Sequence, residues 1–187
     1  MRIWLIGFFS ALMALAGCEV PEEALSNSKP LPKLYRILPE QKNVIQYRML
    51  DSVNALRLAA GASDVEMDTR LNAAAATHSR DMALQNRPWH FGSDGSSPLD
   101  RVARVGYSGS FLGETISETY ETELETLSAW MQRNDTRNII LDPKAEHMGF
   151  AWYQEPSGKI WWTLIMGKGF DPEAAENQNN LSFAVTF

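Results

Sequence analysis

Cysteine and histidine are the residues that this sequence has least of. Cys18 is the single cysteine among 187 residues, so no disulfide can form within the chain, and the fold must rest on its hydrophobic core. The three histidines include no His-Glu-x-x-His pair, and no serine stands in a Gly-x-Ser-x-Gly elbow. The sequence therefore lacks the strongest local signals of zinc proteases and of α/β-type serine hydrolases.

Positive charge is also scarce. The chain has 17 Lys and Arg residues and 23 Asp and Glu residues, which gives a net charge of −6, and no basic patch appears. We therefore expect neither nucleic acid nor an anionic lipid surface as a charge-driven partner. Hydrophobic residues make up 44% of the chain, including 6 Trp and 8 Phe, which predicts a packed globule rather than a disordered chain.

The one long apolar run lies at the start of the chain. It extends over residues 3–16 after Met1-Arg2, has the length of a signal-peptide core and is short for a membrane span. Its end, Leu15-Ala16-Gly17-Cys18, resembles a bacterial lipobox. We predict a lipoprotein signal peptide over residues 1–17 and a lipid on Cys18 that anchors the protein to a bacterial membrane. The alternative is an ordinary cleaved leader with an incidental cysteine.

Three further segments follow from composition. Residues 18–42 are polar, contain several prolines and show no apolar periodicity, which predicts a flexible tether after the lipidated cysteine. Residues 43–170 carry the periodic patterns of a folded domain. Residues 171–187 form a C-terminal tail that is polar at first and alternates from Leu181 onward, as an edge strand does.

Helices are expected in five places, the last a brief one that Asn134 or Asp135 caps and that continues through Leu141. Apolar residues recur at helical spacing from Asn43 to Gly61, and a second helix capped by Asp68 places His78 on its apolar face. Ser97 and Pro98 begin a short helix through residue 105. A fourth helix is predicted over residues 120–131, with its glutamates on the solvated face. His78 is expected to be a hydrogen-bonded core residue.

Three strands are expected between and after these helices, over residues 112–117, 148–154 and 159–167. The last two are joined by Glu155-Pro156-Ser157-Gly158, which favours a turn. The strand over residues 159–167 is apolar on both faces, which predicts a central strand covered on both sides. The fold class that follows is α+β, a small antiparallel sheet between helices.

A chain of motifs supports the same fold. The motifs include Val53-Asn54-Ala55-Leu56-Arg57, the run His90-Phe91-Gly92-Ser93-Asp94-Gly95-Ser96-Ser97-Pro98-Leu99-Asp100-Arg101, Gly113-Glu114, Arg137-Asn138-Ile139-Ile140-Leu141-Asp142-Pro143 and Trp161-Trp162-Thr163. In order and spacing they resemble the CAP superfamily of cysteine-rich secretory, antigen 5 and pathogenesis-related proteins, in its bacterial branch. The resemblance implies an α-β-α sandwich.

The resemblance also implies a cleft with two histidines and two glutamates that binds a metal or ligand. His90 and Glu114 match two of these positions. Thr136 stands where relatives have the second histidine, and His147 stands where they have the other glutamate. His90, Glu114 and His147 are therefore the candidate ligand-binding residues. As two imidazoles and a carboxylate, they are also the candidate ligands for a zinc ion.

Three functions stay open at this stage. The first is binding of a small apolar, lipid or cell-envelope ligand in the His/Glu cleft, with aromatic residues at its rim: Trp89, Phe91, Tyr107, Phe111 and Trp130. The second is hydrolysis, assisted by a metal or using Ser79, Ser93, Ser96 or Ser117 as nucleophile with His90 as base and Glu114 orienting it. The third is a non-catalytic interaction domain with a vestigial cleft.

Overall fold

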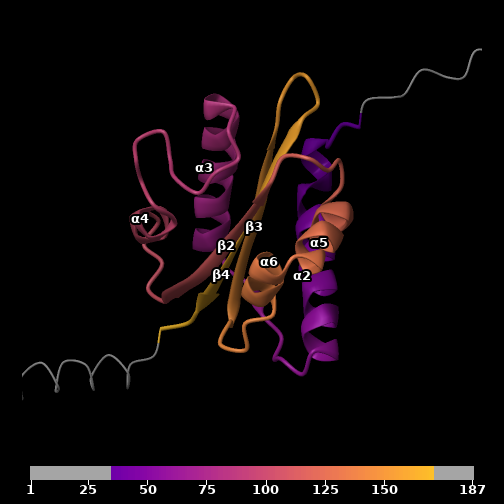
Figure 1. Ribbon diagram of the computed structural model, residues 1–187, viewed down its shortest axis with the longest axis vertical. Coiled ribbons are helices and arrows are strands. Elements are labelled where there is room, and N and C mark those ends of the chain that lie inside the picture. Colours follow the sequence, from indigo (N-terminus) through magenta and orange to yellow (C-terminus); the bar gives the residue numbers. More distant parts are fainter. Residues whose placement is uncertain (1–34, 171–187) are drawn as a thin grey trace, which may run out of the picture. The chain divides into compact units, whose positions relative to one another are not determined.

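Residues 35–170 are the part of the chain that this computed structural model describes. In chain order the elements are η1 (Pro39–Gln41), α2 (Lys42–Ala59), β1 (Glu66–Met67), α3 (Thr69–Gln85), α4 (Pro98–Arg104), β2 (Ser110–Ser117), α5 (Glu123–Gln132), α6 (Asn134–Ile140), β3 (His147–Gln154) and β4 (Ile160–Lys168) (Figure 1). The predicted signal peptide, Cys18 and the predicted strand after Leu181 lie outside the described residues. Within residues 35–170, no helix is long and apolar enough to cross a bilayer.

The sheet has four strands in the order β1-β3-β4-β2. β4 pairs antiparallel with both β3 and β2, as the sequence predicts, but β1 pairs parallel with β3, so the sheet is mixed rather than antiparallel. β1 has only two residues, which is too short for a periodic pattern to reveal. Backbone hydrogen bonds hold it in place, because Glu66 N–H donates to Glu146 C=O and Asp68 N–H donates to Met148 C=O.

Helices cover both faces of the sheet. α3 and α4 lie on one side of it, and α2, α5 and α6 lie on the other (Figure 1). β4 is covered on both sides, and every residue from Ile160 to Gly167 is buried. The predicted α+β sandwich with a central apolar strand is therefore confirmed.

Two hydrophobic clusters correspond to the two layers of helices. The larger lies between the sheet and α2, α5 and α6, and includes Phe150 stacked on Trp162 with ring centroids 5.6 Å apart. The smaller lies between the sheet and α3 and α4. Gly149 allows α3 to approach β3 closely, because a Cβ at this position would collide with the backbone of Leu71.

Side-chain caps define the starts of the helices. Asp68 accepts hydrogen bonds from Arg70 N–H and Leu71 N–H, both at 2.8 Å, as its predicted role requires. The predicted helix over residues 120–131 begins later, at Glu123, because Thr122 and Glu125 form a capping box there.

The prediction that the glutamates of that acidic run are all solvated is wrong for one of them. Glu123 is buried and accepts a hydrogen bond from Arg48 at 2.7 Å. A carboxylate in that position is stable because the guanidinium of another helix, α2, compensates its charge. The spacing of acidic residues along one helix cannot reveal such a partner.

The folded part of the chain begins earlier than residue 43. Ile37 N–H donates to the Gln154 side chain at 3.0 Å, and that side chain donates in turn to Tyr35 C=O at 2.8 Å. Tyr35 and Ile37 also pack against the larger hydrophobic cluster. The last residues of the predicted tether, from Tyr35 onward, therefore belong to the domain.

A buried arginine near the C-terminal end of α2 holds two neighbouring backbone segments in place. Arg57 of α2 is fully buried and donates four hydrogen bonds of 2.8 to 3.0 Å to backbone carbonyls. The acceptors come from the loop after α2, from the last residue of α6 and from the segment after it: Ser63, Ile140, Asp142 and Ala145. Arg57 thus satisfies carbonyls that no strand or helix would otherwise pair.

Replacing this arginine with a side chain of similar length and no donors is expected to be costly. In Arg57→Met the carbonyls of Ser63, Ile140 and Ala145 lose the side-chain donor, while Asp142 C=O keeps the hydrogen bond from Ala145 N–H, and we expect the free energy of unfolding to fall by at least about 3 kcal/mol. Urea unfolding measures the change. Arg70→Met, at an exposed position of α3, is the control and should change stability by less than about 0.5 kcal/mol. A small, equal effect in both variants would contradict the role given to Arg57.

Candidate functional site

Glu114 is the centre of the candidate site. It lies in the middle of β2 and is only 4% exposed, on the side of the sheet that α3 and α4 cover. A buried carboxylate is costly unless a cation or several donors compensate it. Glu114 has two such partners, Arg101 on α4 and His90 in the loop before it, and His78 on α3 lies close to the same carboxylate.

Arg101 makes the strongest of these contacts. Its Nη2 donates to both carboxylate oxygens of Glu114, at 3.0 and 2.9 Å, and its side chain is 4% exposed. Its Nη1 donates to the carbonyls of His90 and Ser96, at 3.0 and 3.2 Å. One buried guanidinium therefore neutralises Glu114 and ties the loop that carries His90 to β2.

His90 is the exposed member of the group. Its Nδ1 lies 2.9 Å from Glu114 Oε1, while 48% of the side chain is exposed. Nδ1 faces a carboxylate oxygen, so the ring tautomer that fits this contact has its proton on Nδ1 and its acceptor at Nε2. The carboxylate thus fixes both the orientation and the tautomer of an imidazole that solvent can reach.

His78 is the buried member. It is fully buried, as its position on the apolar face of the helix predicts, and its Nε2 lies 3.6 Å from Glu114 Oε1. The expectation that it is hydrogen-bonded is wrong, because neither ring nitrogen has a hydrogen-bond partner among the described residues. Burial lowers the pKa of His78 below its ordinary value, and Arg101 lowers it further, while the charge of Glu114 acts in the opposite direction. His78 is therefore a neutral core residue at physiological pH.

A groove of about 570 Å³ lies beside His90. Its lining comes from the segment before His90, from β2 and the loop after it, and from α5 and α6: Pro88, Trp89, His90, Thr115, Ile116, Ser117, Glu118, Thr119, Tyr120, Ala129, Trp130, Gln132, Arg133, Asp135 and Thr136. Thr136, at the position where relatives have a second histidine, thus lines the same groove as His90. We call this space the His90 groove.

His147 lies elsewhere. On the sheet, Glu114 is opposite Ile165 of β4, which is opposite Gly149 of β3, so His147 is two strands and two positions away from Glu114. Its Nδ1 lies 2.9 Å from the hydroxyl of Tyr107, which donates to Lys168 C=O. The structure therefore brings His90 and Glu114 together and leaves His147 out of the pair.

The residues of the site do not fit a zinc ion. Both oxygens of Glu114 already accept hydrogen bonds from Arg101, and a divalent cation placed on them would face the guanidinium charge. Among the described residues, no group of three or more His, Cys, Asp or Glu side chains is arranged to hold a metal ion. The donor set of His90, Glu114 and His147 is thus not a ligand shell.

The five aromatic residues predicted at the rim differ in burial and in whether they line the His90 groove. Tyr107 and Trp130 are buried and belong to the hydrophobic clusters, although an edge of Trp130 reaches the His90 groove. Trp89 lines the groove, and its ring centroid lies 5.4 Å from that of Phe91, which is 46% exposed. Phe111 packs against the smaller cluster. Of the five, Trp89 is the one with both exposure and a place in the groove.

The four candidate serines also have different places. Ser79 is buried and donates to Thr163 Oγ1 at 2.8 Å, and Ser93 donates to Asp81 at 2.6 Å. Ser96 is buried in the loop that Arg101 holds. Ser117 is the member of the set that lines the His90 groove.

Arg101 was not singled out from the sequence, although it ends the motif that begins with His90. The motif places an arginine eleven residues after the histidine, and a helix begins between them at Pro98. That spacing does not say which carboxylate the arginine meets. Only the pairing of β2 with β4, which positions Glu114 beside α4, completes the contact.

Removing the charge of Glu114 is expected to destabilise the fold. Glu114→Gln leaves the buried guanidinium of Arg101 without its counter-charge, so we expect the free energy of unfolding to fall by about 3–5 kcal/mol. Chemical denaturation measures it. Glu118→Gln, which removes a partly exposed partner of Lys159, is the control and should cost less than about 1 kcal/mol. An equal fall in the free energy of unfolding in the two variants would contradict the role given to the Glu114–Arg101 pair.

His78 is expected to make stability depend on pH. Its pKa in the folded protein is lowered, so the unfolded chain binds a proton more readily, and stability falls as pH drops below the ordinary value of 6.5. A variant that cannot titrate, His78→Gln, should show a shallower loss between pH 6.5 and the lowered pKa than the unchanged protein does. Melting temperatures across this range test it, and parallel curves would refute the assignment.

Comparisons with known proteins extend this description. A family model described as the cysteine-rich secretory protein family, CAP, matches residues 50–166. YkwD of Bacillus subtilis strain 168, an uncharacterised protein, is 29% identical over 130 residues, which are 70% of this chain and 50% of that protein. The chain thus spans about half the length of the curated relative it matches.

Two solved structures share the fold. An outer surface protein from Borrelia burgdorferi is 14% identical with a TM-score of 0.63, over 70% of this chain and 96% of that one. An extracellular protein containing a SCP domain from Bacillus anthracis strain Ames is 20% identical with a TM-score of 0.62, over 71% and 45%. Since the family match covers more than half of the sequence, the chain belongs to the CAP family of cysteine-rich secretory proteins.

Proposed function

We propose that this protein is a lipid-anchored, extracytoplasmic CAP domain that binds a small cell-envelope ligand in the His90 groove, without a metal ion. The observation that carries the proposal is the contact of 2.9 Å between His90 Nδ1 and Glu114 Oε1, at the edge of a groove of about 570 Å³. This contact orients the ring, and in the tautomer that fits it Nε2 is the acceptor for a molecule in the groove. The volume lies in the range of small-molecule sites.

The place of the protein in the cell is part of the same proposal. The apolar start of the chain and Leu15-Ala16-Gly17-Cys18 support export followed by lipidation of Cys18. The structural relatives named above include an extracellular protein and an outer surface protein, which supports an extracytoplasmic location. The ligand would then be a component of the envelope in which the domain is held.

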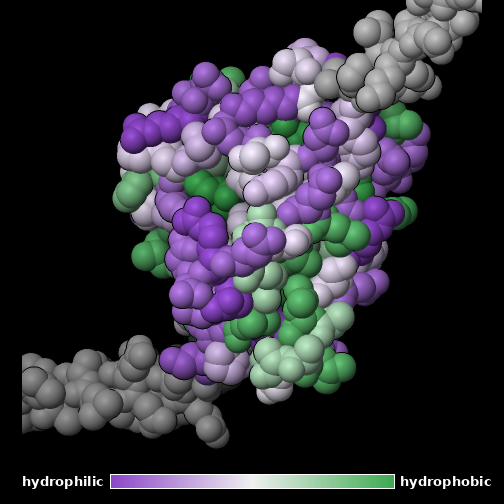
Figure 2. Space-filling model, turned by 45° about the vertical axis from the view of Figure 1, so that its right-hand side comes forward, coloured by the Kyte–Doolittle hydropathy of each residue, from purple (hydrophilic) through white to green (hydrophobic). Residues whose placement is uncertain are grey.

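The lining of the groove supports a ligand that is held there by polar contacts as well as by aromatic rings. On the side shown in Figure 2, hydrophilic side chains predominate, and hydrophobic ones form smaller groups among them. The His90 groove itself combines aromatic rings with hydroxyl groups and charged side chains. Such a mixture orients a ligand through a few placed polar contacts.

Hydrolysis is the second candidate, and one observation favours it. A base oriented by a carboxylate is half of a catalytic triad, and His90 with Glu114 has that geometry. The nucleophile would be Ser117, the candidate serine in the same groove. Turnover of ester substrates that is lost in both His90→Ala and Ser117→Ala would establish this activity, and its absence leaves binding as the function.

The binding proposal predicts a selective effect of His90. With a panel of phospholipids, sterols and peptidoglycan fragments, we expect at least one class to raise the melting temperature. His90→Ala should weaken that ligand about tenfold, because one hydrogen bond to an oriented acceptor is lost, and should change stability little because the side chain is half exposed.

His147→Ala is the matched control, since His147 lies outside the His90 groove and should leave the affinity unchanged. If no member of the panel shifted the melting temperature, the groove would be a vestigial cleft on an interaction domain. If both histidine variants lost affinity equally, the ligand would not be bound where we place it.

A further inference from the structure

One hydroxyl at the base of the His90 groove has no partner. Thr115 of β2 is fully buried and lines the groove, and its Oγ1 makes no hydrogen bond with any described residue. A buried hydroxyl left unpaired costs about 1–3 kcal/mol, so native proteins rarely keep one without a reason. A polar group of a ligand in the groove would supply the missing partner.

Two further hydroxyls in the groove have unused capacity. Thr136 Oγ1 donates to Trp130 C=O at 2.5 Å, which leaves its lone pairs as acceptors. Ser117 Oγ accepts a long hydrogen bond of 3.4 Å from Thr119 N–H, which leaves its own proton to donate. The groove thus offers uncharged donors and acceptors in one place, which is the complement of a ligand rich in hydroxyl or amide groups.

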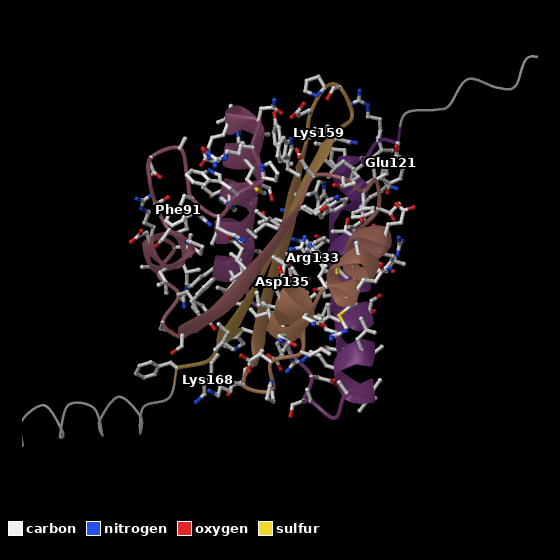
Figure 3. All side chains as sticks on the ribbon, viewed as in Figure 1. Phe91, Glu121, Arg133, Asp135, Lys159 and Lys168 are labelled. Atoms are coloured by element: carbon white, nitrogen blue, oxygen red, sulfur yellow. The ribbon has the colours of Figure 1, made fainter. Side chains whose placement is uncertain are left out.

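The formal charges in the lining are already compensated. Arg133 and Asp135, which lie together near the junction of α5 and α6 (Figure 3), form an ion pair at 2.7 Å. Glu118 pairs with Lys159. A phosphate headgroup or a free carboxylate would therefore find no unpaired arginine or lysine among the described lining residues, and an uncharged ligand is favoured.

Aromatic rings complete the lining. Trp89 is fixed, because its Nε1 donates to Gln85 Oε1 at 3.0 Å and the guanidinium of Arg87 lies 3.9 Å from its ring centroid. Tyr120 is 38% exposed, and its backbone carbonyl is held by Trp162 Nε1 at 2.8 Å. The Trp89 ring held in this way, with Tyr120 beside it in the lining, can pack against the apolar C–H face of a sugar while hydroxyl groups bind its edge.

We propose that the ligand of the His90 groove is an uncharged saccharide, bound by Thr115 Oγ1 at the base of the groove and by Tyr120 at its rim. This inference rests on the proposed function and names the chemical class of its ligand. A sterol or an acyl chain fits less well, since neither brings enough polar groups to satisfy Thr115, Ser117 and Thr136 together.

Oligomers of N-acetylglucosamine, which are uncharged and carry hydroxyl and acetamido groups, are the probe. We would titrate them into the isotopically labelled full chain and follow backbone amide shifts by NMR. The expected result is saturable binding with shifts at His90, Thr115 and Tyr120. Thr115→Val keeps the shape and removes the hydroxyl, and should weaken binding about three- to tenfold. Tyr120→Ala should weaken it about tenfold.

Two variants outside the groove are the controls. Thr77→Val removes an exposed hydroxyl on α3, and Tyr47→Ala removes an exposed tyrosine on α2, so neither should change the affinity. Saccharide binding that is weakened equally by the controls, or not weakened by Thr115→Val and Tyr120→Ala, would overturn the site assignment.

Phosphatidylcholine vesicles, with and without a sterol, separate the two proposals. If these shift the groove residues and no saccharide does, the saccharide inference fails and the proposed binding function stands. If neither class shifts any residue of the groove, both fail.

Discussion

The buried ion pair between Glu114 and Arg101 is the contact on which the rest of the site depends. It joins β2 to α4 through two hydrogen bonds, and the same guanidinium holds the carbonyls of His90 and Ser96. Removing both charges from water is expensive, and the close contact of Arg101 Nη2 with both carboxylate oxygens compensates that cost. The loop between α3 and α4 therefore has one position relative to the sheet, and His90 takes its orientation from it.

The same contact determines the chemistry. The carboxylate that would give a metal ion its charge complement is instead neutralised by a guanidinium, and the position of the second family histidine holds Thr136, a neutral hydroxyl. What remains is an oriented imidazole above a groove with an unpaired hydroxyl group. These residues are the basis for proposing a polar, uncharged ligand rather than a metal ion.

Local signals in the sequence were sufficient for most of the fold. Asp68 and Ser97 predict the starts of α3 and α4 from a few neighbouring residues. The apolar pattern on both faces of β4 likewise predicts a central strand. The failures share a physical cause, since they involve partners far away in sequence. β1 is defined by its pairing with β3, Glu123 by Arg48, and Tyr35 by the side chain of Gln154.

The site divides in the same way. His90 and Glu114 could be paired from the sequence because the family motifs carry both, and the structure places them in contact. His147 could not be placed, because its distance from Glu114 depends on the register of two strand pairings that no motif encodes. Arg101 was visible as the end of a motif, but its partner became clear only when β2 and α4 were seen side by side.

The most direct test of the central claim is a calorimetric titration of zinc into the protein carrying Cys18→Ser, so that the thiol cannot bind the metal. Because Arg101 occupies both oxygens of Glu114, we predict no stoichiometric binding at micromolar zinc, and no difference between this protein and a second variant with His90→Ala added. One zinc ion per chain, lost on adding His90→Ala, would contradict the account and show that the cleft binds a metal ion.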